Sequence, residues 1–331
     1  MQSIDPHFLP WQTDLLKRAL ELKASHHLPH AVMIDSNSSQ DMTSFIGHLS
    51  MLLLCDAVTE LSPCGQCDAC RMMLAGTYAD FSLVSLEADE KTQKISKNIK
   101  IEQIRNLIHE VSLTHQYQRL KIAAIYPAEA MNRASANALL KTLEEPAPGV
   151  LLLLVTHNRG RIPITLRSRC QSWSVGLPGQ AQAREWLANE GFEAQDIERY
   201  LDYAGGDPVL ALELEQNDYA SLVKQFKTRF GQFLRGDLSV TGLCQELLAY
   251  ELSLLRRLVN MTLTAYCYQS SGIDADANPH PGGEKSRAQQ LLDLRQRAQN
   301  QLRIEENNLD LQLQLEDVLI SLKQILTRRL I

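Results

Sequence analysis

The 331-residue sequence has no long hydrophobic run and no excess of positive charge. Its longest apolar run, residues 150–155, is far too short to cross a bilayer, and its N-terminus lacks the basic and apolar segments of a signal peptide. The net charge of −6 argues against a protein that binds nucleic acid mainly through its overall charge. We therefore expect a cytoplasmic protein without a membrane partner, long enough for two or three domains.

The sequence also lacks the residues of a phosphate-binding loop between the first expected strand, residues 31–34, and the helix that follows it. A phosphate-binding loop would occupy this place, because such loops join a strand to the next helix. Glycines let the backbone N–H groups of such a loop surround a phosphate, and a lysine neutralises its charge. Neither is present here, so we expect no tight binding of ATP. The degenerate site would consist of Asp35, Ser36, Asn37, Ser38 and Ser39.

Strands are expected to alternate with helices through the first half of the chain. Apolar runs predict strands at residues 31–34, 81–86, 121–126, 150–156 and 172–175, and helical spacing predicts helices at 10–25, 42–54, 100–114 and 132–145. This alternation is typical of an α/β domain whose parallel sheet is covered by helices on both faces. We assign this domain to residues 1–175.

The strand pattern ends near residue 176. Residues 176–213 indicate a small helical domain, and residues 214–331 indicate a larger, all-helical domain. The segment near 270–287 is polar and rich in glycine and proline, so we expect a mobile loop there. Because the amphipathic helices of the C-terminal domain need apolar partners, we expect this domain to mediate oligomerisation.

Four of the seven cysteines fall within sixteen residues. Cys55, Cys64, Cys67 and Cys70 have the spacing C-x8-C-x2-C-x2-C, and two-residue gaps let neighbouring thiolates converge on one tetrahedral zinc ion. An odd total in a reducing compartment argues against disulfides. We therefore expect a structural Zn²⁺ site in a module spanning residues 55–70. The alternatives are free buried cysteines and a redox pair of the C-x-x-C type.

Two stretches of the α/β domain are specific. Residues 131–146 read MNRASANALLKTLEEP, and residues 151–170 read LLLLVTHNRGRIPITLRSRC. They resemble the ATPase-fold subunits of the bacterial DNA polymerase III clamp loader, which share this helix, a strand ending in threonine and a Ser-Arg-Cys motif. The four-cysteine module lies where that family has its zinc site. The resemblance implies an AAA+ domain, a small helical lid domain and a helical collar domain.

The motifs that are missing from this chain indicate which type of clamp-loader subunit it resembles. The motor subunits carry Gly-Lys in the phosphate loop, Asp-Glu after the strand at residues 121–125, and an arginine in the lid that senses nucleotide. This chain has Tyr126-Pro127 after that strand, with Glu129 two positions out of register, and Val209 in the lid. The resemblance therefore implies a non-hydrolysing stator that is not an enzyme on its own.

One functional motif of the family is intact. Ser168, Arg169 and Cys170 match the motif whose arginine reaches into the neighbouring subunit, so the resemblance assigns Arg169 as a finger offered in trans to ATP. The simpler alternative is a surface arginine paired with a nearby carboxylate. The implied partners are the gamma/tau motor subunits and the delta subunit, and indirectly the sliding clamp and primer–template DNA during chromosomal replication.

Other functions stay open at this point. A motor subunit of the same family would hydrolyse ATP by itself, and the missing Gly-Lys and Asp-Glu motifs argue against it. A zinc-dependent nucleic-acid-binding adaptor outside any clamp loader would bind DNA tightly and in a salt-dependent way. Stoichiometric zinc would exclude a third alternative, a thiol redox enzyme.

Overall fold

The computed structural model describes residues 6–36, 38, 40–88, 96–113, 116–117, 120–250, 252–271, 287–301 and 311–327. The chain divides into two compact units, residues 1–211 and 212–331. No helix among the described residues is both long enough and apolar enough to span a bilayer.

The first unit is built on a five-stranded sheet in which all paired strands run parallel. The strand order is β2-β3-β4-β1-β5. Strands β3 and β4 are buried along their whole length, which explains why both are continuous apolar runs in the sequence. The strands are β1 (Ala31–Ser36), β2 (Phe81–Val84), β3 (Lys121–Ile125), β4 (Val150–Thr156) and β5 (Gln171–Val175).

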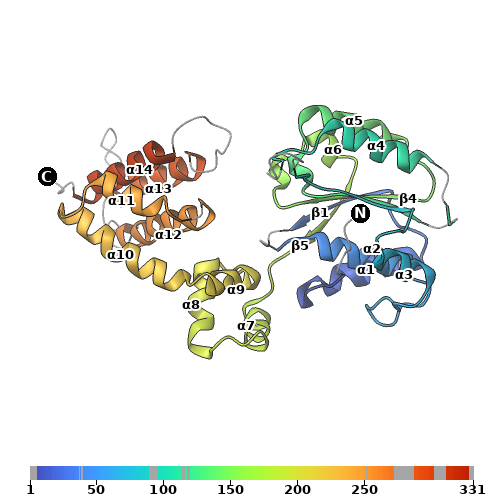
Figure 1. The fold of residues 1–331 in the computed structure, drawn as a ribbon, viewed down its shortest axis with the longest axis horizontal. Helices are drawn as coiled ribbons and strands as arrows, with labels where there is room; N and C mark the ends of the chain where they lie inside the picture. The colour runs from blue at the N-terminus through green and yellow to red at the C-terminus, as the bar shows by residue number, and fades with distance from the viewer. Residues whose placement is uncertain are drawn as a thin grey trace. The chain divides into compact units, whose positions relative to one another are not determined.

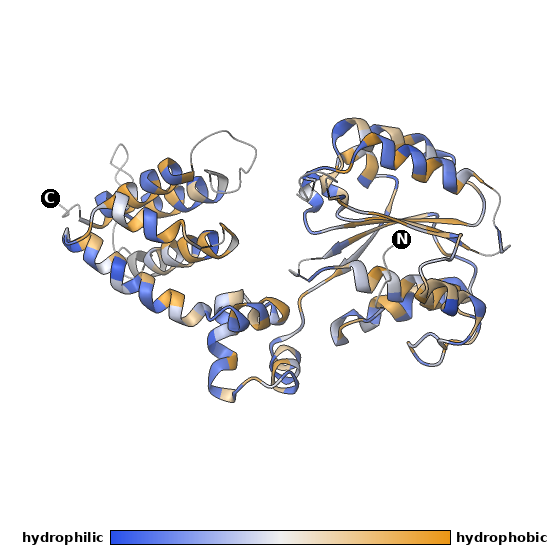
Figure 2. Cartoon of the chain, in the orientation of Figure 1, coloured by the Kyte–Doolittle hydropathy of each residue, from blue (hydrophilic) through white to orange (hydrophobic). Residues whose placement is uncertain are grey.

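Helices cover both faces of this sheet, as the sequence predicts (Figure 1). One face packs against η1 (Pro10–Gln12), α1 (Thr13–Ala24), α2 (Thr43–Leu54) and α3 (Asp68–Leu74). The other packs against α4 (Ile101–Ser112), α5 (Arg133–Glu144) and α6 (Ile164–Arg167), and the short turns η2 (Ala128–Ala130) and η3 (Arg159–Arg161) follow β3 and β4. Along β1, Val32 and Ile34 belong to the first core and Met33 to the second, because side chains alternate across a strand. Hydropathy follows the same division, with apolar residues lining the sheet (Figure 2).

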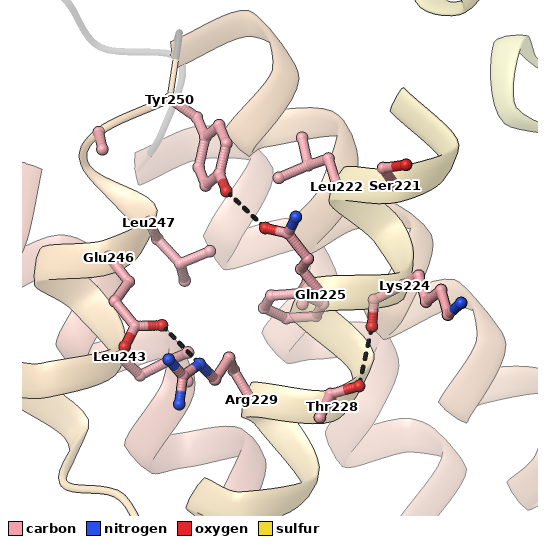
Figure 3. Close-up of a pocket in the computed structure, with 12 residues that line it drawn as sticks. Ser221, Leu222, Lys224, Gln225, Thr228, Arg229, Leu243, Glu246, Leu247 and Tyr250 are labelled. Atoms are coloured by element: carbon pink, nitrogen blue, oxygen red, sulfur yellow. Dashed lines mark hydrogen bonds and ion pairs between the residues drawn. The ribbon is translucent and has the colours of Figure 1, made fainter. Parts of the chain in front are cut away.

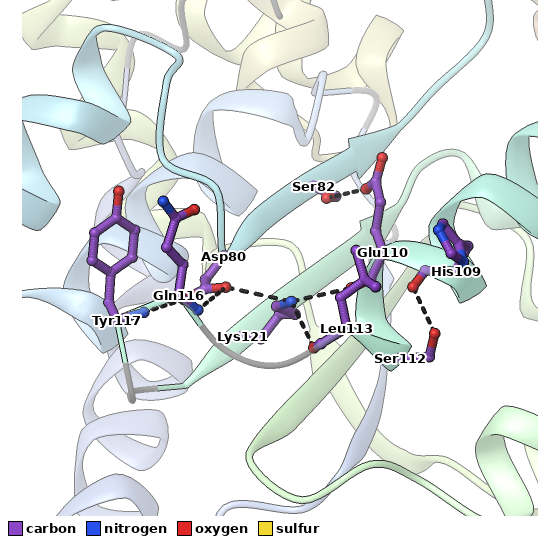
Figure 4. Close-up of polar contacts among 9 residues, drawn as sticks. All are labelled: Asp80, Ser82, His109, Glu110, Ser112, Leu113, Gln116, Tyr117 and Lys121. Carbon is purple, nitrogen blue, oxygen red and sulfur yellow. Dashed lines mark hydrogen bonds and ion pairs between the residues drawn. The ribbon is translucent and has the colours of Figure 1, made fainter.

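A buried ion pair ties the start of β3 to the turn before β2 (Figure 4). Lys121 Nζ lies 3.4 Å from Asp80 Oδ1, and the two side chains are 8% and 1% exposed. The ammonium also donates to the carbonyl oxygens of Glu110 and Leu113. Asp80 accepts backbone N–H bonds from Gln116 and Tyr117. These partners compensate for the loss of water around both charges.

Three helices complete the first unit and lead into the second: α7 (Gln180–Asn189), α8 (Ala194–Ala204) and α9 (Pro208–Gln216). Gly205 and Gly206, with φ of 65° and 87°, end α8 in a left-handed turn that suits glycine. Trp186 of α7 meets Trp11 edge-to-face, with ring centroids 5.6 Å apart. This contact joins α7 to the turn that begins α1.

The second unit is helical throughout its described residues. Its helices are α10 (Tyr219–Arg235), α11 (Val240–Leu247), α12 (Leu252–Ser271), α13 (Arg287–Gln301) and α14 (Leu311–Thr327). A hollow of about 760 Å³ lies between α10 and α11, where the Tyr250 hydroxyl donates to Gln225 and Arg229 pairs with Glu246 (Figure 3). The expected mobile loop at 270–287 lies almost wholly outside the described residues.

Candidate functional site

Ser38, in the loop after β1, is hydrogen-bonded to other residues of the chain. The Ser38 hydroxyl donates to Asp207 Oδ1, 3.4 Å away, and accepts the backbone N–H of Gln40 at 3.2 Å. The Ser38 N–H in turn donates to Ser36 Oγ. The hydroxyl and N–H of Ser38 and the N–H of Gln40 are therefore partnered from within the chain. Asn37 and Ser39, which also belong to the expected degenerate site, lie outside the described residues.

Asp207 reaches this loop from the break before α9. Its Oδ1 atom accepts the backbone N–H groups of Val209 and Leu210 at 3.1 and 3.3 Å, so it also caps the start of that helix. The residue is 4% exposed. A buried carboxylate at this place would repel the phosphates of a nucleotide.

Two buried glutamines fill the space beside the loop. Gln12 Nε2 donates to Gln40 Oε1 at 2.9 Å, and Gln12 Oε1 accepts the backbone N–H of Leu9 at 2.7 Å. Both glutamines are buried. The segment before α1 and the loop after β1 are thereby joined through side chains that offer no charge to a phosphate.

A tyrosine–histidine pair lies after β3, where the motor subunits would carry Asp-Glu. The Tyr126 hydroxyl lies 2.8 Å from His157 Nε2, and His157 Nδ1 lies 3.3 Å from the carbonyl oxygen of Ser36. Because a carbonyl only accepts, Nδ1 carries a proton and donates it to Ser36. Burial raises the pKa of Tyr126 to about 12, so its phenol stays neutral at physiological pH.

Two further polar side chains at this edge also have partners in the chain. Thr156, at the end of β4, is fully buried, and its Oγ1 accepts the backbone N–H of Asn158 at 3.0 Å. Glu129 accepts the backbone N–H of His157 at 3.1 Å. Residues 31–45 contain Asp35 and Asp41 but no lysine or arginine. The segment at residues 31–45 therefore offers acidic and neutral side chains and no lysine or arginine for a triphosphate.

Arg169 lies directly after α6, beside the C-terminal end of α5. Its Nη2 forms an ion pair with Glu144 Oε1, and its Nη1 donates to the carbonyl oxygen of Thr165 at 2.8 Å. A third, longer contact joins Nη1 to Ser168 Oγ at 3.5 Å. The arginine side chain is 34% exposed. The carboxylate pairing expected of a plain surface arginine is thus present, and the guanidinium still reaches solvent.

The other two residues of the Ser-Arg-Cys motif have local roles. The Ser168 hydroxyl donates to the carbonyl oxygen of Thr165 and ends the short helix α6. Cys170 is 9% exposed and packs in the core under α5 and α6. Burial raises its pKa to about 11, so the thiol stays protonated and is a poor nucleophile.

The four clustered cysteines converge on one point. The sulfur atoms of Cys55, Cys64, Cys67 and Cys70 all lie within 4.8 Å of one another. Sulfur ligands of a tetrahedral zinc ion, bound at about 2.3 Å, would be about 3.8 Å apart, so this donor set fits Zn²⁺. Backbone N–H groups of Gln66 and Cys67 lower the pKa of Cys64 to about 6, which favours the thiolate that a metal binds.

The cysteine module is anchored on α2 through His48. The Nε2 atom of His48 lies 2.8 Å from the carbonyl oxygen of Leu61, which belongs to the loop between the first two cysteines. On its other side the imidazole meets the ring of Phe8, with centroids 4.6 Å apart. Burial lowers the pKa of His48, so the ring is neutral at physiological pH.

A comparison with family models identifies the family of the α/β domain. Residues 11–176, half of the chain, match the family model described as DNA polymerase III, delta subunit. The chain belongs to the delta-prime family of DNA polymerase III subunits. That family accounts for the motifs at 131–146 and 151–170, which both lie within the matched residues.

The chain is also similar to individual proteins of this and related kinds. The chain is 36% identical to DNA polymerase III subunit delta' of Pseudomonas aeruginosa over 62% of its own length and 60% of the relative. It is 34% identical to subunit tau of Salmonella typhimurium, over 67% of this chain and 34% of that one. A gamma subunit-related protein of Thermotoga maritima aligns with 95% of this chain and 99% of its own, at 19% identity and a TM-score of 0.46. The aligned region spans about three fifths of the delta' relative.

Proposed function

We propose that the chain is a non-catalytic stator subunit of the DNA polymerase III clamp loader. In this role it binds no ATP tightly and offers Arg169 in trans to the ATP of a neighbouring gamma/tau motor subunit. The observation that supports this most strongly is that the Ser38 hydroxyl in the degenerate phosphate loop is hydrogen-bonded within the chain, whereas the motif arginine is partly exposed. The Ser38 hydroxyl donates a hydrogen bond to Asp207. Arg169 lies at the surface, and some of its N–H groups remain available to a phosphate.

The finger acts by supplying charge where the reaction develops it. As the γ-phosphate bond breaks, negative charge spreads over the phosphoryl oxygens, and a guanidinium presented by a neighbour stabilises that charge. Arginine suits this task because its planar group stays protonated and can donate two parallel hydrogen bonds. The Ser-Arg-Cys motif places Arg169 just after α6, ahead of the buried Cys170 that anchors the segment in the core.

The remaining parts would serve the assembly. Helices α7 to α9 would form the lid domain of an AAA+ module, and residues 214–331 would form the collar that joins the subunits. The apolar face of α14, including Leu315, Val318 and Leu322, is buried within its own unit. Leu313 and Ile320, 61% and 41% exposed, are the apolar side chains of α14 left for a neighbour. The Zn²⁺ held by the four cysteines would be structural, and the delta subunit, the sliding clamp and primed DNA would be further partners.

Two linked measurements test this proposal. Calorimetric titration of the isolated chain with MgATP is expected to give no saturable binding below about 1 mM, because a triphosphate would have to displace the Ser38–Asp207 bond without a cation to receive it. Adding the chain to motor and delta subunits is expected to raise clamp- and DNA-stimulated ATP hydrolysis. Micromolar binding or ATP hydrolysis by the chain alone would favour a motor subunit instead.

A further inference from the structure

Glu144 is the carboxylate that touches the motif arginine. It is the last residue of α5, 25 positions before Arg169 in the chain, and its Oε1 atom accepts from Arg169 Nη2. The carbonyl oxygen of Thr165 holds the other terminal nitrogen, Nη1, at 2.8 Å. The guanidinium is therefore fixed at two points that come from different helices.

This ion pair is placed poorly for stabilising the fold. The side chains of Glu144 and Arg169 are 50% and 34% exposed, and surface ion pairs of this kind contribute little to stability. A two-point attachment does, however, restrict the orientation of a long side chain that would otherwise sample many rotamers. The contact therefore matters more for where the guanidinium points than for whether the protein folds.

The attachment leaves part of the guanidinium available. Arginine has five N–H donors, and the contacts to Glu144, Thr165 and Ser168 use three of them at most. The two that remain can donate to phosphate oxygens without breaking the pair. Glu144 is thus compatible with a phosphate-bound arginine, and its own charge keeps the guanidinium at its place while no phosphate is near.

We propose that Glu144 is the positioning residue for Arg169. The carboxylate orders the guanidinium before the neighbouring subunit arrives, so that less side-chain freedom is lost when the arginine meets the γ-phosphate. This inference rests on the proposed function, in which Arg169 acts in trans. Glu145, the next residue, is exposed and provides a matched control of the same charge on the same helix end.

The test compares clamp loaders reconstituted with five forms of the full chain: wild type, Glu144→Gln, Glu145→Gln, Arg169→Ala, and the double variant Glu144→Gln/Arg169→Ala. The readouts are kcat and KM for clamp- and DNA-stimulated ATP hydrolysis, with assembly and thermal unfolding measured for each form. Glutamine keeps the length of glutamate but loses the charge that holds the guanidinium.

We expect Glu144→Gln to lower kcat about tenfold with KM changed less than about twofold, since orientation matters in the transition state. Glu145→Gln should match wild type, and the double variant should equal Arg169→Ala, because Glu144 acts through Arg169. If Arg169→Ala is slow while Glu144→Gln matches wild type or is faster, the positioning role is wrong and the proposed function stands. If Glu144→Gln slows the Arg169→Ala form further, Glu144 acts elsewhere and the inference fails. If Arg169→Ala itself has no effect, the proposed function fails first.

Discussion

The Ser38 hydroxyl donates a hydrogen bond to Asp207, 3.4 Å away, and joins the loop after β1 to the start of α9 across 169 residues of chain. A phosphate loop of a nucleotide-binding protein would leave its polar groups available for the nucleotide at this place. Here the hydroxyl and N–H of Ser38 and the N–H of Gln40 have partners within the first unit. The bond therefore connects the α/β sheet to the helices that follow it without any ligand.

Asp207 should stabilise the protein because it accepts a hydrogen bond from Ser38 in the loop after β1 and also caps the start of α9. Asp207→Ala removes the acceptor for Ser38 and the cap of α9, and we expect it to lower the free energy of unfolding by about 1–3 kcal/mol. Urea unfolding measures this change. Asp202→Ala, an exposed aspartate on α8, is the matched control and should leave the midpoint unchanged. Equal midpoints for both variants would mean that Asp207 contributes nothing.

Tyr126 should make stability fall at high pH. Its folded-state pKa is about 12, whereas an unfolded tyrosine ionises near 10. Because the folded pKa is raised, its contribution is complete below pH 10 and is lost as the pH rises from about 10 towards 12. We expect the free energy of unfolding of wild type to decrease relative to Tyr126→Phe over this window. A difference between the two proteins that does not change with pH would contradict the buried, neutral phenol.

Zinc should bind with one equivalent per chain and stabilise the segment between α2 and α3. We expect chelation to lower the melting temperature and Cys64→Ser to weaken metal retention, because structural zinc contributes its binding free energy to folding. Metal analysis of the purified chain and thermal unfolding with and without chelator measure both effects. Cys244→Ser, at a buried cysteine of α11, is the control that should keep its zinc. A metal-free chain with an unchanged melting temperature would point to free cysteines instead.

Removing one partner of the buried ion pair between Lys121 and Asp80 should strongly destabilise the protein. Lys121→Met leaves a buried carboxylate without its cation, and we expect a loss of about 3–5 kcal/mol in the free energy of unfolding. Adding Asp80→Asn should recover part of that loss, since the amide keeps an acceptor for the N–H groups of Gln116 and Tyr117. Urea unfolding of the single and double variants measures the recovery. A double variant that is less stable than Lys121→Met would contradict the pairing.

The sequence predicts those parts of the fold that depend on neighbours along the chain. The apolar runs at 121–126 and 150–156 are strands β3 and β4, and the helical spacing at 132–145 is α5. The strand expected at 81–86 ends earlier, at Val84, because its last residues leave the pairing with β3. The sequence also misses the short helix α3, whose N-terminal cap is the sulfur of Cys67.

The contacts within the candidate site could not be predicted from the sequence, because the residues that form each contact are far apart along the chain. Tyr126 and His157 are 31 residues apart, and nothing in the spacing of the histidines indicates that one of them contacts this tyrosine. Glu144 and Arg169 lie in separate motifs that fold against each other. The convergence of the four cysteine sulfur atoms could be predicted from the sequence. Three of the cysteines are separated by gaps of two residues, and thiolates at this spacing can bind one tetrahedral zinc ion.

ATP turnover by a clamp loader reconstituted with Arg169→Ala tests the central claim most directly. Arg184→Ala is the matched control, because Arg184 is also a half-exposed arginine paired with a glutamate, Glu198. With assembly verified for both, we expect Arg169→Ala to reduce clamp- and DNA-stimulated hydrolysis by about 10³-fold or more at the adjoining site, and Arg184→Ala to match wild type. If both variants hydrolyse ATP at the wild-type rate, Arg169 is an ordinary surface arginine and the chain is no more than a scaffold.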